Sequence, residues 1–148
     1  MKARIAIAAA SAVALISSGG ALALAIPAAA SESGSHTLKF ISERVNVATF
    51  SKTSEGIQDK DVTSKGKLIG FDQLNLVFNP KTGMGTAGVS LDVHGGILIG
   101  YINLSGSRTF KGYITAGIGN FKGAFGTING KILNKAGTRS AVTITYSV

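Results

Sequence analysis

The sequence predicts an all-β fold, and three observations lead to this prediction. After Ser31, no segment carries apolar residues at helical spacing over a useful length. Short runs rich in Val, Ile, Phe and Thr are separated by turn residues, and glycine recurs every few positions. Residues 142–148 alternate strictly between apolar and hydroxyl side chains, which is the period of two expected for a strand. Together these patterns favour an antiparallel sheet that is closed into a barrel or folded as a sandwich.

Residues 1–30 have the layout of a secretory signal peptide. Lys2 and Arg4 form a short positive region, and an apolar run follows over residues 5–26. Small residues at 28–30 then provide an A-x-A cleavage site. The alternative is a transmembrane anchor, but polar and glycine residues at 17–20 interrupt the apolar run. We therefore expect a cleaved leader, no membrane insertion after cleavage, and a secreted, bacterial protein.

Composition limits the chemistry that this chain of 148 residues can perform. It contains no cysteine, which excludes a disulfide scaffold, a catalytic thiolate and a zinc–thiolate site. The formal net charge is +8, or +6 once residues 1–30 are removed with Lys2 and Arg4. The lysines are scattered rather than clustered, so we expect no nucleic-acid partner. The charge is better explained by solubility and by attraction to anionic polymers of the cell envelope.

The N-terminal part of the expected domain begins with a flexible segment at residues 31–36. A first strand is expected over Thr37–Phe50, which is rich in Val, Ile, Phe and Thr. Residues Ser51–Lys65 carry charges and no strong apolar period, and this pattern predicts a long exposed loop. Asp59 and Asp61 lie in that loop. They could bind calcium weakly, but a solvated surface is the simpler interpretation.

The remainder of the domain reads as strands joined by tight turns. Further strands are expected at residues 67–78, 84–93, 97–104, 109–118 and 121–133, and a last one that ends at Val148. Turn chemistry occurs between them at Asn79–Gly83, His94–Gly96 and Asn134–Gly137. Glycines inside the strand patterns predict bends or close backbone approaches. These glycines are Gly70, Gly88, Gly100, Gly112, Gly126 and Gly130.

Two segments carry a resemblance to a known family. Gly66–Leu74, which reads GKLIGFDQL, resembles the strand with a D-x-L motif in dirigent proteins and allene oxide cyclase-like barrels. Ile114–Thr127, which reads ITAGIGNFKGAFGT, resembles their ITGGTGxYxGAxGT hairpin. The resemblance covers residues 37–148. It implies a single eight-stranded antiparallel β-barrel domain with an internal apolar cavity. Phe125 stands where dirigent proteins often have arginine, which favours a mainly apolar interior.

The resemblance also implies the kind of chemistry to look for. Plant members cyclise an allene oxide or steer the coupling of phenoxy radicals, and some bacterial relatives catalyse cycloadditions. Asp72 is the candidate catalytic acid or polar anchor, if its side chain points inward, although a structural role as an ion-pair partner or bend cap is the simpler reading. The candidate ligand-binding residues are the aromatic side chains of Phe71, Tyr101, Tyr113 and Phe125.

Other familiar sites are missing from the sequence. The only histidines, His36 and His94, are far apart and belong to no metal-binding motif, so we expect no metal and no cofactor. The glycines at 117, 119 and 123 belong to a strand-like hairpin rather than to a nucleotide-binding loop. The leading hypothesis is a secreted barrel that holds a small apolar ligand and acts on it as an isomerase or cyclase by confinement. The alternatives are a non-catalytic binding or structural module of the cell envelope, and a lipocalin-like carrier. A homo-oligomer is compatible with each hypothesis.

Overall fold

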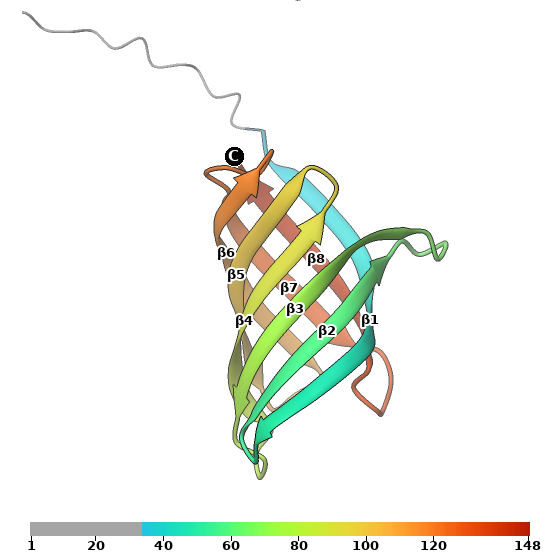
Figure 1. The fold of residues 1–148 in the computed structure, drawn as a ribbon, viewed down its shortest axis with the longest axis vertical. Coiled ribbons are helices and arrows are strands. Elements are labelled where there is room, and N and C mark those ends of the chain that lie inside the picture. The colour runs from blue at the N-terminus through green and yellow to red at the C-terminus, as the bar shows by residue number, and fades with distance from the viewer. Residues whose placement is uncertain (1–33) are drawn as a thin grey trace, which may run out of the picture.

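The computed structural model describes residues 34–148, and every regular element in this range is a β-strand (Figure 1). The expected signal peptide lies outside the described residues. No helix that could span a membrane occurs in residues 34–148. The eight strands are β1 (His36–Ser51), β2 (Ser54–Val62), β3 (Leu68–Phe78), β4 (Met84–Val93), β5 (Gly96–Ser105), β6 (Thr109–Gly119), β7 (Phe125–Ile132) and β8 (Arg139–Ser147).

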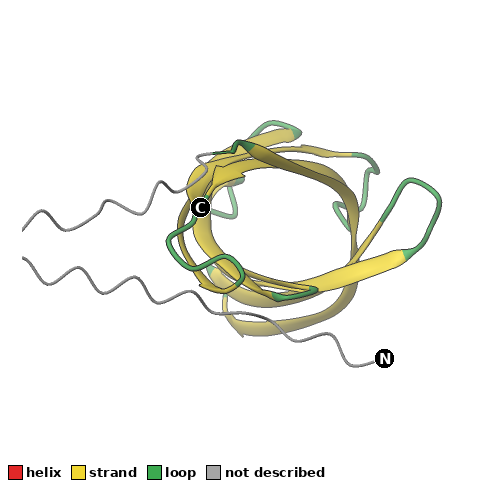
Figure 2. Ribbon diagram, turned by 90° about the horizontal axis from the view of Figure 1, so that it is seen from above, coloured by secondary structure: helices red, strands yellow, loops and turns green. Residues whose placement is uncertain are grey.

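The strands form one closed antiparallel barrel in which each strand pairs with the next along the chain (Figure 2). β8 closes the barrel by pairing with β1, from His36 opposite Tyr146 to Glu43 opposite Arg139. On the outer surface the Glu43 carboxylate lies 3.3 Å from Lys60 Nζ and 3.2 Å from Arg139 Nε. The predicted eight-stranded antiparallel barrel is therefore confirmed, and the sandwich alternative is wrong.

The prediction of a long loop over Ser51–Lys65 is wrong, because most of this segment is β2. β2 pairs with β1 on one side and with β3 on the other, so it is an integral wall strand. Its inward positions carry Ile57, Asp59 and Asp61, and its outward positions carry polar residues. Two inward aspartates remove the apolar alternation by which a strand is normally recognised.

Two smaller expectations also need correction. The strand expected from Phe121 begins at Phe125, because residues 121–124 form a turn between β6 and β7. β1 begins at His36, inside the segment expected to be flexible, and the His36 ring stacks on the Tyr146 ring at a centroid distance of 5.3 Å. The turns predicted after β3, β4 and β7 are confirmed.

The hydrophobic core runs along the interior of the barrel and is packed at the end where β1 begins and β8 ends, which we call the closed end. The turn between β6 and β7 contributes Phe121, and the ring of Phe121 packs edge-on against Tyr146 at 5.6 Å. Leu98 and Ala124 are almost completely buried beside it. The opposite end carries the β1–β2, β3–β4, β5–β6 and β7–β8 connections, and we call it the mouth end (Figure 1).

A close approach near the mouth end requires glycine. Gly130 on β7 lies opposite Phe110 on β6, and a Cβ atom at Gly130 would overlap the Phe110 ring. The glycine therefore makes room for an aromatic side chain that projects into the lumen. Gly88 on β4 differs, because a Cβ atom there would meet nothing within 4 Å.

Candidate functional site

The barrel contains an internal cavity of about 150 Å³, lined in part by the side chains of the hydrophobic core. Its wall is mainly aliphatic, with the rings of Phe40 and Phe110 added. Leu76, Leu104 and Ile132 are half-buried and lie toward the mouth. The remaining apolar lining consists of Ile57, Leu74, Ala87, Val89, Leu91, Ile102, Ile128, Val142 and Ile144.

Polar side chains enter this cavity mainly from one side, where β1, β2 and β3 run next to each other. Ser42 and Arg44 come from β1, Asp59 from β2 and Asp72 from β3. The strand register aligns them, because Arg44 lies opposite Asp59 and Asp59 lies opposite Asp72. Directly opposite residues on one face have Cβ atoms about 5 Å apart. The fold thus creates a row of charged groups across three strands.

Few hydrogen bonds hold this row together. The Ser42 hydroxyl donates to Asp59 Oδ2 at 2.8 Å. Arg44 Nε lies 3.9 Å from Asp59 Oδ1, which is an ion pair without a hydrogen bond. Asp59 Oδ1 and Asp72 Oδ1 are both buried and have no hydrogen-bond partner. Buried polar atoms without partners are rare in native proteins, and such atoms beside a cavity indicate a place for a ligand or water.

Asp61 lies behind this row, toward the closed end, and is completely buried. Its register partner is Gly70, which has no side chain to fill the inner face of β3 at that position. With the carboxylates ionised, neither oxygen of Asp61 has a hydrogen-bond partner. The expectation that Asp59 and Asp61 form a solvated surface is therefore wrong. Both side chains point into the barrel because β2 is a strand with its odd-numbered positions inward.

Burial and mutual repulsion raise the pKa values of these carboxyl groups. Burial raises the pKa of Asp61 to about 8. The charge of Asp72, the hydrogen bond between Asp72 and Asp61, and the charge of Asp59 raise it further. Burial also raises the pKa of Asp72 to about 6, with a further contribution from the Asp59 charge. The pKa of Asp59 is raised by burial too, although its hydrogen bond from Ser42 and the Arg44 charge oppose the rise.

These pKa values define the charge on the cavity wall near neutral pH. Asp61 is then mainly protonated and can donate a hydrogen bond to Asp72, which is mainly ionised. Because the pKa of Asp72 is close to neutral pH, its carboxyl group can both accept and donate a proton. The sequence made Asp72 a candidate on the condition that its side chain points inward, and this condition is met, since Asp72 lines the cavity with only 6% of its surface exposed. Its catalytic role stays a prediction.

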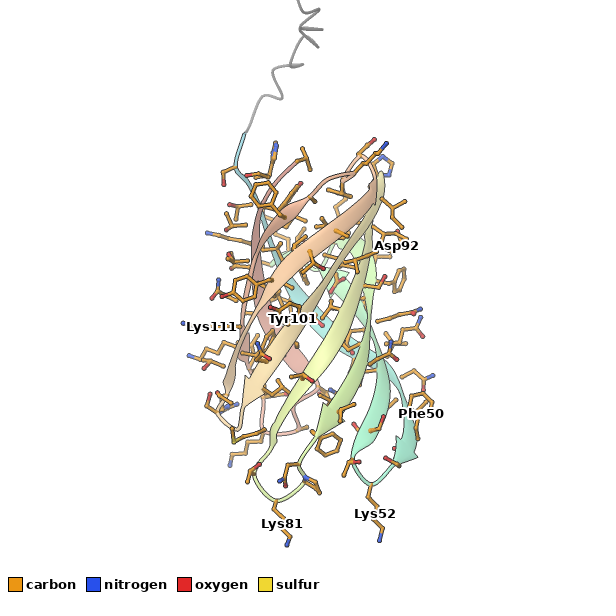
Figure 3. The ribbon with its side chains drawn as sticks, turned by 90° about the vertical axis from the view of Figure 1, so that its left-hand side faces the viewer. Phe50, Lys52, Lys81, Asp92, Tyr101 and Lys111 are labelled. Carbon is orange, nitrogen blue, oxygen red and sulfur yellow. The ribbon has the colours of Figure 1, made fainter. Side chains whose placement is uncertain are left out.

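The four aromatic residues predicted to bind the ligand do not line the cavity. Phe71 is 43% exposed, because it neighbours the inward Asp72 and so faces outward. Tyr101, Tyr113 and Phe125 are also exposed. Figure 3 shows Tyr101 on the outer surface of β5. Because Phe125 faces outward, the absence of arginine at this position leaves the composition of the cavity unchanged.

Three of these aromatic residues instead border a shallow groove on the outside of β5 to β8. Tyr101 and Tyr113 are cross-strand neighbours whose ring centroids lie 5.7 Å apart. Phe125 and several threonine residues complete the groove. The wall strands separate this groove from the lumen.

The sequence interpretation missed Ser42, Arg44 and Asp59. A signal for them exists, because Phe40, Ser42 and Arg44 continue one inward face at period two. No group of three or more His, Cys, Asp or Glu side chains in residues 34–148 is arranged to hold a metal ion.

Comparison with known proteins shows a shared fold without a detectable sequence family. No protein-family model matches the sequence, and no curated protein matches it significantly. Among solved structures, a pyocyanin demethylase has a TM-score of 0.60 at 16% identity, covering 75% of this chain and 99% of that one. The Diels–Alderase AbmU from Streptomyces koyangensis has a TM-score of 0.60 at 12% identity, covering 81% of this chain and 71% of that one. The pterocarpan synthase dirigent protein GePTS1 has a TM-score of 0.58 at 14% identity, covering 79% and 90%. The chain thus shares a barrel fold with proteins of the kinds that its two motifs resemble.

Proposed function

We propose that this barrel binds a small, largely apolar molecule in its lumen and acts on it as an isomerase or cyclase. Confinement holds the substrate in a reactive conformation, and Asp72 exchanges a proton with its polar end. The observation that carries the proposal is the unpartnered Asp72 Oδ1 atom, buried beside Asp59 at one side of a mainly apolar cavity. A ligand pocket combines apolar walls with a few placed polar groups in the same way.

The size of the cavity limits the substrate. A cavity of about 150 Å³ can hold a single aromatic ring. Half-buried side chains near the mouth end leave room for a short substituent to extend outward. Holding such a molecule in one reactive conformation can supply several kcal/mol toward a ring-forming or isomerising step. The walls also exclude water from a reactive intermediate.

Asp72 supports the proton-transfer part of the proposal. Its pKa of about 6 is close to neutral, where a general acid or base is most effective. Asp61 stands behind it as a buried proton carrier that does not reach the cavity wall. The structural neighbours include a demethylase, a Diels–Alderase and a dirigent protein, so barrels of this shape accommodate such activities.

We also propose that the protein is exported and works outside the cytoplasm. The charged start, apolar run and A-x-A site of residues 1–30 support this proposal. Mass spectrometry of the protein from the growth medium should give a mature N-terminus at Ser31. An intact Met1 on the medium protein, or retention of the chain inside the cell, would refute export.

The proposed function can be tested on molecules that the barrel itself selects. Purified protein is exposed to an extract of its host, and bound compounds are released and identified by mass spectrometry. Each bound compound is then incubated with the wild type, with Val89→Phe, which fills the cavity, and with Asp72→Asn. We expect binding and conversion by the wild type and neither by Val89→Phe. Asp72→Asn should lose conversion but still bind in the lumen, with an affinity that falls only where Asp72 contacts a charged group of the compound. Circular dichroism establishes that both variants fold.

Other outcomes separate the competing hypotheses. Binding without conversion by the wild type would support a non-catalytic carrier and refute the enzyme. Undiminished binding by a folded Val89→Phe variant would show that the lumen is not the site. Conversion by Asp72→Asn at the wild-type rate would refute proton transfer by Asp72. Catalysis by confinement alone would then remain the proposal.

A further inference from the structure

The cavity wall carries an unbalanced charge. Two carboxyl groups, Asp59 and Asp72, line the cavity, and Arg44 is the only cationic side chain among the lining residues. Arg44 is also displaced toward Asp59, where its Nε atom lies 3.9 Å from Oδ1. No cation in the described structure forms a salt bridge with Asp72. An ionised carboxylate in an apolar cavity is strongly unfavourable unless something compensates its charge.

The unpartnered oxygens point to what compensates it. Asp59 is only 8% exposed and Asp72 only 6% exposed. Each has one oxygen without a hydrogen-bond partner, and both residues line the cavity. Because Asp59 and Asp72 are direct register partners, the two oxygens belong to neighbouring side chains on the same face. A group that donates hydrogen bonds and carries positive charge suits this position best.

The rest of the wall favours an organic cation over a metal ion. A small hydrated metal ion needs several oxygen ligands, and residues 34–148 hold no suitable group of three acidic or histidine side chains. An organic cation supplies its own apolar body, which would occupy the aliphatic part of the cavity. Phe40 and Phe110 also line the cavity, and aromatic faces attract organic cations.

We propose that the molecule bound in the lumen carries a basic nitrogen and binds as an organic cation. The cationic group is a protonated amine or aza-aromatic nitrogen, and the body of the molecule is about one ring in size. The positive charge lies next to the carboxylates of Asp59 and Asp72. This inference rests on the proposed function, because it names the ligand class of the same cavity. It goes beyond that function by assigning a charge to the bound molecule.

The inference can be tested with three probes that share one benzyl body: benzylammonium, benzyl alcohol and benzoate. Binding is measured by isothermal titration calorimetry on the purified protein. We expect benzylammonium to bind about tenfold or more tightly than benzyl alcohol, the size expected for a charge-assisted hydrogen bond in a buried site. Benzoate should bind least. The preference should grow between about pH 5 and pH 8, since binding the cation competes with the proton on Asp72.

The charged groups around Asp72 are few, which makes this pH dependence interpretable. Asp59 and Asp61 face it from β2, and Arg44 comes from β1. On its other side β4 presents the apolar Leu91. Because Arg44 keeps its charge throughout this range, the preference for the cation follows the carboxyl groups alone.

Variants distinguish the charge from the shape of the cavity. Asp72→Asn keeps the shape and removes the charge, so it should bind benzyl alcohol as before and lose the preference for benzylammonium. Asp92→Asn is the matched control, because Asp92 is an exposed carboxylate on the outer face of β4 (Figure 3). It should leave all three affinities unchanged.

The possible failures are distinguishable. Equal or tighter binding of benzyl alcohol or benzoate to the wild type would overturn the cation inference and leave the apolar-ligand proposal standing. Retention of the cation preference in Asp72→Asn would also overturn it. Absence of binding by all three probes at millimolar concentration, in protein that circular dichroism shows to be folded, would contradict the proposed function itself.

Discussion

Replacing Asp61 by asparagine should make the barrel more stable at alkaline pH. In the wild type, the pKa of Asp61 is raised from 3.8 to about 8, so the folded state holds its proton more tightly than the unfolded chain does. Stability is therefore greatest below the unfolded pKa and is lost as the pH rises toward the folded pKa. Asparagine has nearly the same shape and does not ionise. The Asp61→Asn variant should lose most of this pH dependence.

The two buried pKa values set the size of the effect. Between about pH 5 and pH 8, the raised pKa of Asp61 corresponds to a loss of about 4 kcal/mol in the free energy of unfolding. The smaller rise for Asp72, from 3.8 to about 6, adds about 1 kcal/mol. The wild type should thus lose about 5 kcal/mol over this range, and Asp61→Asn should lose about 1 kcal/mol. These are upper values, because water that reaches the buried carboxylates reduces the penalty.

Urea unfolding, followed by far-ultraviolet circular dichroism at several pH values, measures how the free energy of unfolding depends on pH. The control is Asp92→Asn, which removes an exposed carboxylate and should keep the wild-type slope. The reasoning is refuted if wild-type stability is constant or increases from about pH 5 to pH 8, or if Asp61→Asn keeps the full slope. Either result would mean that Asp61 is not held protonated inside the barrel.

Two further pairs of variants test the packing. Gly130→Ala should destabilise the fold by about 1–3 kcal/mol, because its Cβ would displace the Phe110 ring, whereas Gly88→Ala should change the free energy of unfolding by less than about 0.5 kcal/mol. Equal effects of the two glycine replacements in urea unfolding would contradict the close contact between Gly130 and the Phe110 ring. Leu98→Ala should cost about 2–5 kcal/mol, since Leu98 is completely buried at the closed end. Tyr101→Ala, on the outer face, should cost less than Leu98→Ala and leave binding in the lumen unchanged, and a loss of lumen binding in Tyr101→Ala would argue against the internal site.

The sequence was sufficient to predict most of the fold. Strands with apolar alternation, such as residues 142–148, and turns with Asn, Pro or Gly are recognisable because their local chemistry agrees with the structure. β2 was not recognisable for a physical reason. Its inward positions hold Asp59 and Asp61, and a strand that places charges in a core does not show the pattern by which cores are detected.

The candidate site was harder to predict than the fold for the same reason. Asp72 was found because it interrupts an apolar strand, but its partners are brought to it by strand pairing, through the β1–β2 and β2–β3 registers. The aromatic candidates were placed wrongly because size and hydrophobicity do not say which face of a strand a side chain occupies. The outward direction of Phe71 does follow from strand alternation once Asp72 points inward, so an inward Asp72 and a lumen-facing Phe71 exclude each other.

The closure of the ring by β1 and β8 makes the whole barrel depend on its last element. Strands at opposite ends of the chain must meet before either has a complete set of backbone partners, so we expect assembly to be slow and all-or-none. A product that stops before Arg139 would leave two strand edges unpaired, one on β1 and one on β7. Each edge could then pair with a strand of another chain. Premature termination of synthesis, or clipping of the last nine-residue strand by a protease, should therefore yield aggregates rather than a smaller working protein.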